Sequence, residues 1–158
     1  MAVRRRIVGF EADDVGDQAV VLDCHHRQHV RHQPPFRLAP WVGDPAERAR
    51  RIGTDWPCPL CDRGEIPDEL VVLRTTTTWD ERTLPDALRR SHRVASGRWG
   101  RLRVLSGSVR FVAATEPPTD VVVDAPGTQG IPPDVEHHIE PCGAVEVVID
   151  FLGPAPDR

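Results

Sequence analysis

Short alternations of apolar and polar residues run along most of the chain and predict strands rather than helices. Apolar residues 7–10 and 19–22 flank a polar turn, so we predict a β-hairpin over residues 6–22. The segment Asp-Pro-Ala-Glu at residues 44–47 indicates instead the start of a helix. Asp44 would cap this helix and the proline would occupy its first turn.

Beyond a polar stretch at residues 65–68, the chain consists of short apolar runs separated by Gly and Pro turn signals. These runs read LVVLRTTTTW, GRLRVLSGSVRFVAAT, DVVVDAP and AVEVVIDFL. Alternation is clear at residues 102–104 and 109–111, as expected for strands with one buried face. Evenly spaced strands favour a β-sandwich or small barrel. We therefore predict a mainly β protein with two domains, residues 1–64 and 65–158.

Composition supports this interpretation and excludes several classes of protein. Sixteen prolines and twelve glycines among 158 residues disfavour long helices. The sequence has no apolar run of the roughly 20 residues that a membrane-spanning helix needs. No apolar run follows the basic start either, so we expect no membrane association and a cytoplasmic location.

Charge disfavours a nucleic-acid partner. The net charge is −4, and acidic residues are interspersed among the arginines of the first half. A nucleic-acid-binding segment usually concentrates positive charge on one surface. We therefore do not expect DNA or RNA binding.

Cysteines and histidines cluster in the first domain in a pattern typical of zinc ligands. Cys58 and Cys61 have the spacing that lets one tight turn present two thiolates to a metal. Cys24 and His26 would supply the opposite pair, because alternate residues of a strand point the same way. His29 and His32 are alternatives to His26, and a pair of unliganded or redox-active thiols is the alternative to a metal site.

The first domain resembles a small uncharacterised bacterial family. The resemblance rests on residues 6–10 (Arg-Ile-Val-Gly-Phe), on residues 24–35 (CHHRQHVRHQPP) and on Cys-Pro-Leu-Cys-Asp at residues 58–62. The family tends to have glycine where this chain has His25. The resemblance implies a zinc-ribbon-like metal-binding module without a known activity. Gln28 and His29 also match the family motif, although a structural zinc would not require them. They would either orient the zinc ligands or bind an anion or a partner.

Two histidines far apart in the second half could meet inside a small barrel. His92 precedes the strand that begins at Trp99, and His137 follows the Pro-Pro pair at residues 132–133. Imidazole suits several transition metals, and a site with two or three protein ligands leaves a position open. The alternative is that both histidines are surface residues or form ordinary hydrogen bonds.

The second half is similar to the domain of YeaR-type proteins that also precedes the methyltransferase of tellurite-resistance TehB proteins. The similarity rests on Ser91-His92, Ser96-Gly-Arg-Trp-Gly-Arg-Leu, Gly107-Ser-Val, Ile131-Pro-Pro and His137-x-Ile-Glu-Pro. It implies a cupin-like double-stranded β-helix, or jelly roll, with a metal-binding pocket. The usual His-x-His of the first cupin motif is reduced here to a lone histidine.

The resemblance carries over His92 and His137 as candidate metal ligands. Glu140 could be a third ligand, a general base or the partner of an arginine. His138 would point to the opposite face of its strand and is a spare ligand, and Trp99 would be pocket wall or core.

These observations suggest a metal-binding stress or resistance protein. It would bind a small molecule or oxyanion at a divalent transition metal in the pocket and hold a separate structural zinc. A metal-dependent oxygenase, isomerase or hydrolase is the alternative. We leave open whether the chain is an enzyme. A homodimer is a further expectation, because small cupin-like domains often pair through their sheets.

Overall fold

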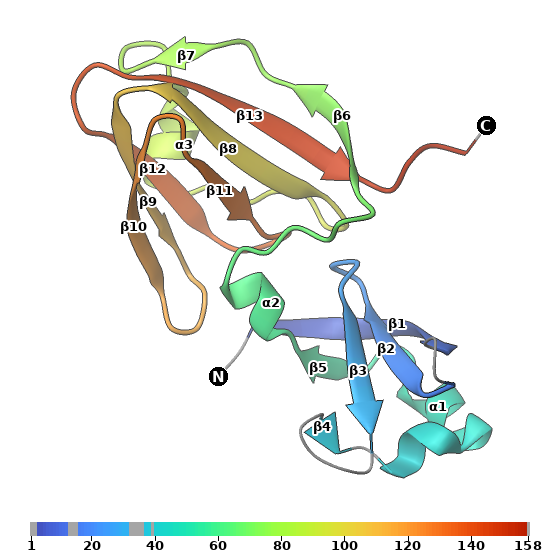
Figure 1. Cartoon of the computed structure of the whole chain (residues 1–158). Helices are drawn as coiled ribbons and strands as arrows, with labels where there is room; N and C mark the ends of the chain where they lie inside the picture. The colour runs from blue at the N-terminus through green and yellow to red at the C-terminus, as the bar shows by residue number, and fades with distance from the viewer. Residues whose placement is uncertain (1–2, 13–15, 32–36, 39, 158) are drawn as a thin grey trace. The chain divides into compact units, whose positions relative to one another are not determined.

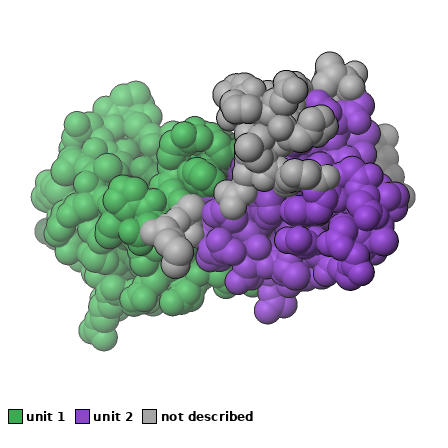
Figure 2. All heavy atoms as spheres, turned by 90° about the horizontal axis from the view of Figure 1, so that it is seen from below, with its two compact units in different colours: residues 1–2, 59–158 green, residues 3–58 purple. Residues whose placement is uncertain are grey.

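The structure, a computed structural model, describes residues 3–12, 16–31, 37–38 and 40–157. Far more residues of this part of the chain lie in strands than in helices (Figure 1), which confirms the predicted mainly β fold. Contacts divide the chain into two compact units, residues 3–58 and residues 59–158 (Figure 2). The domain boundary that we predicted after residue 64 stays a prediction.

The first unit is built on a five-stranded sheet with the strand order β4-β3-β2-β1-β5. Its strands are β1 (Arg4–Ala12), β2 (Gln18–Leu22), β3 (Arg27–Arg31), β4 (Arg37–Leu38) and β5 (Asp55–Pro57). Strands β1 and β2 pair antiparallel, from Ile7 with Leu22 to Ala12 with Gln18, which confirms the predicted hairpin. Strand β3 continues the sheet antiparallel to β2.

The short helices of this unit lie between β4 and β5. They are the 3-10 helix η1 (Pro40–Gly43) and the α-helix α1 (Pro45–Arg51). The Asp44 carboxylate accepts a hydrogen bond of 2.9 Å from the backbone N–H of Ala46, as predicted for the cap of α1. With seven residues α1 is the longest described helix, and none of the described helices could span a membrane.

The apolar core of the first unit is small. Its buried apolar side chains, apart from the cysteines, are Ile7, Ala19, Val20, Leu22, Val30, Val42 and Trp56. Trp41 packs edge-on against both Phe10 and Trp56, with ring centroids 5.9 Å apart in each pair. A unit of this size buries too little apolar surface for comfortable stability, so a further source of stability is expected.

The second unit is a cupin-like barrel of two sheets, as predicted. One sheet has the strand order β11-β8-β13-β6, with β7 paired to β13, and the other has the order β10-β9-β12. The strands are β6 (Val71–Thr75), β7 (Trp79–Asp80), β8 (Trp99–Ser106), β9 (Ser108–Ala113), β10 (Thr119–Asp124), β11 (Thr128–Ile131), β12 (His137–Pro141) and β13 (Glu146–Gly153). Two short helices complete it, α2 (Pro59–Asp62) and α3 (Asp86–Arg90), and α3 packs against β12.

Alternation along the strands directs one set of side chains into the barrel. On β9, Val109, Phe111 and Ala113 are buried, whereas Arg110 is exposed. On β12, His137 and Ile139 are buried in the same way. The positions that face the interior therefore include His137, one of the two histidines that the sequence predicted to meet inside the barrel.

A buried carboxylate lies in the middle of β13 and is surrounded by donors. Asp150 is 1% exposed. It accepts hydrogen bonds from the guanidinium groups of Arg101 (2.9 Å) and Arg103 (2.8 and 3.0 Å) and from the hydroxyl of Thr75 (2.7 Å). Burial alone would raise the pKa of Asp150, but these donors stabilise the carboxylate and lower it below its usual value.

Asp150→Asn tests whether this network stabilises the barrel. The variant removes the charge that both arginines contact, so we expect the free energy of unfolding to fall by about 2 kcal/mol at neutral pH. Asp120→Asn, at a half-exposed carboxylate paired with Arg110, is the matched control and should have a much smaller effect. Urea denaturation of the three proteins measures the difference.

The same network predicts a pH dependence. Because the folded-state pKa of Asp150 is lowered, its stabilisation is present above the unfolded pKa of about 3.9 and is lost as the pH falls through the folded value. The gap between the wild type and Asp150→Asn should therefore shrink on acidification below about pH 4. If the difference in unfolding free energy between the wild type and Asp150→Asn did not change at low pH, the charge of Asp150 would not contribute to stability.

Candidate metal and ligand sites

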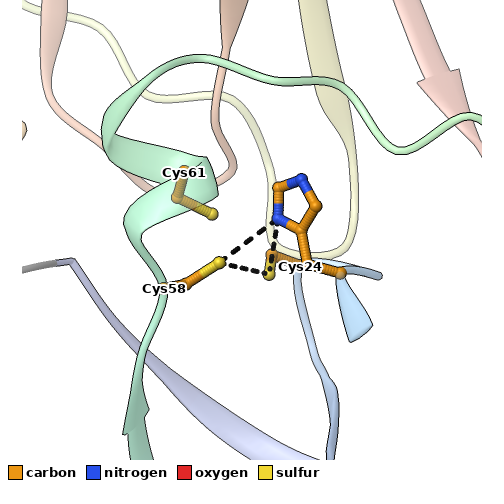
Figure 3. A group of neighbouring side chains, drawn as sticks. Cys24, Cys58 and Cys61 are labelled. Atoms are coloured by element: carbon orange, nitrogen blue, oxygen red, sulfur yellow. Dashed lines mark hydrogen bonds between the residues drawn. The ribbon is translucent and has the colours of Figure 1, made fainter. Parts of the chain in front are cut away.

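Four buried side chains form one cluster, three from residues 3–58 and one from α2. Cys24 and His26 lie in the tight connection between β2 and β3, and Cys58 directly follows β5. Cys61 lies one helical turn further along the chain, in α2. The ligand atoms of these four residues lie within 4.8 Å of one another, and the three sulfurs converge in Figure 3.

The spacing of these atoms fits a tetrahedral ion. The Sγ atoms of Cys24 and Cys58 are 3.8 Å apart, and they lie 3.4 and 3.3 Å from Nδ1 of His26. Zinc bonds of about 2.3 Å to sulfur and about 2.0–2.1 Å to nitrogen give tetrahedral edges of about 3.8 Å between sulfurs and about 3.5 Å between sulfur and nitrogen. The donor set and its dimensions therefore suit zinc.

The electrostatics of the cluster favour a cation. Burial lowers the pKa of His26, but the hydrogen bonds and negative charge of Cys24 and Cys58 outweigh it and raise the pKa to about 10. Without a metal, the His26 imidazole would thus hold a proton. A metal ion would take the place of that proton.

The neighbouring histidines and the glutamine have different positions. The Gln28 side-chain amide donates to the Sγ of Cys58 at 3.5 Å, so it contacts a ligand rather than joining the cluster. His29 is exposed on β3. His32, the other alternative, lies outside the described residues.

The chain conformation explains how Cys24 and His26 meet. His25 has a φ of 74°, in the left-handed region that favours glycine, and its N–H donates to the Leu22 carbonyl. Cys24 and His26 therefore converge because the chain turns sharply between them. We predicted the same pair from strand alternation, but neither residue lies in a strand.

The second candidate site is a cavity of about 390 Å³ in the barrel. Its lining is mostly apolar, with a few polar groups. The lining residues include Trp79, Leu88, Ile131 and Phe151, which are apolar, and Arg74, His92 and His137, which are polar. Pockets of a few hundred Å³ with this composition are typical small-molecule sites.

The structure brings His92 and His137 together at this cavity. Their backbones exchange two hydrogen bonds, of 2.9 and 3.0 Å, and their rings lie 5.5 Å apart at an interplanar angle of 78°. The His137 ring stacks on Phe111, with the centroids 5.8 Å apart. The two imidazoles are therefore held in fixed orientations by backbone pairing and packing.

Each imidazole leaves one buried nitrogen free to bind a ligand. Nδ1 of His137 donates to the Val135 carbonyl at 3.1 Å, so in the neutral ring Nε2 carries the lone pair. Burial lowers the pKa of His137, which favours this neutral form. Nε2 of His137 and Nδ1 of His92 are buried without a hydrogen-bond partner among the described residues.

Glu140 does not join these histidines. Three positions separate it from His137 on β12, so its side chain points to the other face of the sheet. There it accepts hydrogen bonds from Arg110 at 3.0 Å and from His138 at 3.3 Å, which agrees with the arginine-partner alternative. His138 lies on the same outer face. Trp99 is fully buried in the core and is absent from the described cavity lining.

Two groups near the cavity were not anticipated from the sequence. Arg74 and Trp79 line the cavity from β6 and β7, and Thr75 links its wall to the buried Asp150. From the tract LVVLRTTTTW, the sequence predicts a strand but not which of its side chains face the cavity. Its register against β13, which sets what it faces, depends on pairing across more than seventy residues.

Two family models match the chain. Residues 8–65 match a family described as a protein of unknown function (DUF3565), and residues 74–149 match the TehB-like domain. Both resemblances expected from the sequence are thereby confirmed. No curated protein matches the chain.

Solved structures share the barrel fold. A protein from E. coli (strain K12) aligns with a TM-score of 0.53 and 24% identity, over 60% of this chain and 91% of that one. TehB from Haemophilus influenzae aligns with a TM-score of 0.50 and 23% identity, over 55% of this chain and 32% of that one. At these identities the likeness shows the fold, and the chain spans about a third of the length of TehB.

His25→Gly tests the account of the turn between the ligands. Glycine adopts the left-handed conformation without a Cβ clash, so we expect the free energy of unfolding to rise by about 0.5–1 kcal/mol. His25→Ala is the matched control, because it keeps the Cβ and should bring no gain. Urea denaturation measures both, and a glycine variant no more stable than the alanine variant would contradict this explanation of the turn.

Proposed function

We propose that this protein is a metal-binding, cupin-like protein with two separate sites. A structural zinc would be held by Cys24, His26, Cys58 and Cys61. A small molecule or oxyanion would bind in the barrel cavity, at a transition-metal ion held by His92 and His137. The observation that carries the second site is that two histidines line a largely apolar cavity and that each has a buried imidazole nitrogen without a hydrogen-bond partner among the described residues.

The zinc proposal rests on the chemistry of the donor set. Three thiolates and one imidazole fill all four positions of a tetrahedral zinc ion, as in structural sites. All four ligands are at most 5% exposed, so the site is closed to substrates. Zinc would supply the stability that the small apolar core of residues 3–58 does not.

Unlike the zinc site, the metal in the barrel would keep coordination positions open. Two imidazoles leave at least two coordination positions for water or a ligand. In the described lining of the cavity there is no carboxylate to act as a third ligand or as a general base. This lack of a carboxylate favours ligand binding over metal-dependent catalysis.

A homodimer and a cytoplasmic location stay predictions.

Metal analysis by mass spectrometry tests both sites at once. We expect close to one zinc per chain in the wild type, lost in Cys58→Ser, and a second metal that is lost in His137→Ala. Cys142→Ser is the matched control, because Cys142 is exposed and lies outside the cluster. Circular dichroism checks that each variant is folded.

Each site can fail separately in this experiment. Zinc retained by Cys58→Ser would overturn the structural zinc. A metal content unchanged by His137→Ala would overturn the barrel metal and leave the cavity as a metal-free pocket.

A further inference from the structure

The cavity in the barrel offers far more apolar than polar surface to a ligand. Its apolar lining residues are Trp79, Pro85, Ala87, Leu88, Val94, Ile131, Ile149 and Phe151. The volume of about 390 Å³ could hold on the order of ten water molecules. A ligand that fills it must therefore have an apolar body.

The three threonine hydroxyls in the lining already form hydrogen bonds within the protein. The Thr75 hydroxyl donates to Asp150. The Thr76 hydroxyl donates to the Thr77 carbonyl and accepts from the Ile149 N–H, and the Thr77 hydroxyl donates to the Thr78 carbonyl. The other polar side-chain groups of the described lining are the Arg74 guanidinium, the Trp79 indole N–H and the imidazoles of His92 and His137, each of which has one buried nitrogen without a partner among the described residues.

Arg74 gives the described lining its one permanent charge. Arg74 is exposed on β6, and its guanidinium lies 4.6 Å from the centroid of the ring of Phe151, another residue of the cavity lining. Among the described residues no carboxylate pairs with it. An uncompensated arginine of this kind favours an anionic group, which it can bind through two parallel hydrogen bonds.

An inorganic oxyanion suits this cavity poorly. Such an ion is small and strongly hydrated, and its burial is costly unless many donors replace the lost water. One guanidinium and the proposed histidine-held metal ion, among eight apolar residues, do not supply enough of them. A carboxylate on a hydrocarbon body needs only one such partner, while its body gains from the apolar walls.

We infer that the cavity binds a small organic monocarboxylate. Its carboxylate lies at Arg74, and a ring or short branched hydrocarbon body lies against Trp79, Leu88 and Ile131. This inference rests on the proposed function, because it names the ligand class of the same cavity. It selects organic anions from the wider group of small molecules and oxyanions.

Titration calorimetry with benzoate, benzamide and sulfate tests the inference. Benzamide has the shape of benzoate without its charge, and sulfate has charge without an apolar body. We expect benzoate to bind at least about tenfold more tightly than either. In Arg74→Gln the preference of benzoate over benzamide should disappear. In Arg63→Gln, which removes one positive charge outside the cavity lining, it should persist.

The possible outcomes separate this inference from the proposed function. Equal binding of benzoate and benzamide, a preference for sulfate, or no binding of any probe would each overturn the organic monocarboxylate. The proposed barrel metal would survive those results if His137→Ala still loses its metal. If the preference of benzoate over benzamide were lost in Arg63→Gln but kept in Arg74→Gln, that result would also overturn the inference.

Discussion

The N-terminal half of this protein depends on how three buried thiols and one buried imidazole are compensated. Their ligand atoms lie within 4.8 Å of one another, in a unit whose apolar core is small. Four such groups cannot stay charged, close together and out of water unless a cation joins them. A tetrahedral zinc ion satisfies the distances, the donor types and the need for stability together.

The two candidate sites differ in a way that assigns them different tasks. In the cluster, four buried side chains could fill every position of a tetrahedral ion, and the Gln28 amide donates to one of the sulfurs. In the barrel, two imidazoles are fixed by backbone pairing but keep free nitrogens beside a cavity. The first arrangement suits structure and the second suits binding of a small ligand.

Much of the fold and part of the site could be predicted from the sequence. The hairpin, the Asp44 cap and the barrel follow from local alternation and turn residues, which act over short distances. The Cys58–Cys61 spacing is equally local. Cys24 and His26 do lie together in the structure. Strand alternation is not the cause, because the chain turns at His25 instead of continuing as a strand.

The remaining site residues depend on contacts that no local pattern encodes. Arg74 faces the cavity, and Asp150 meets two arginines, because of the register between strands distant in sequence. Glu140 is different, since its odd spacing from His137 along β12 already indicates opposite faces.

X-ray absorption spectroscopy at the zinc edge of the purified protein tests the central claim most directly. We predict a first shell of three sulfurs at about 2.3 Å and one nitrogen at about 2.0–2.1 Å. A first shell of only oxygen and nitrogen would contradict it, because zinc would then be bound somewhere other than the buried cysteine cluster.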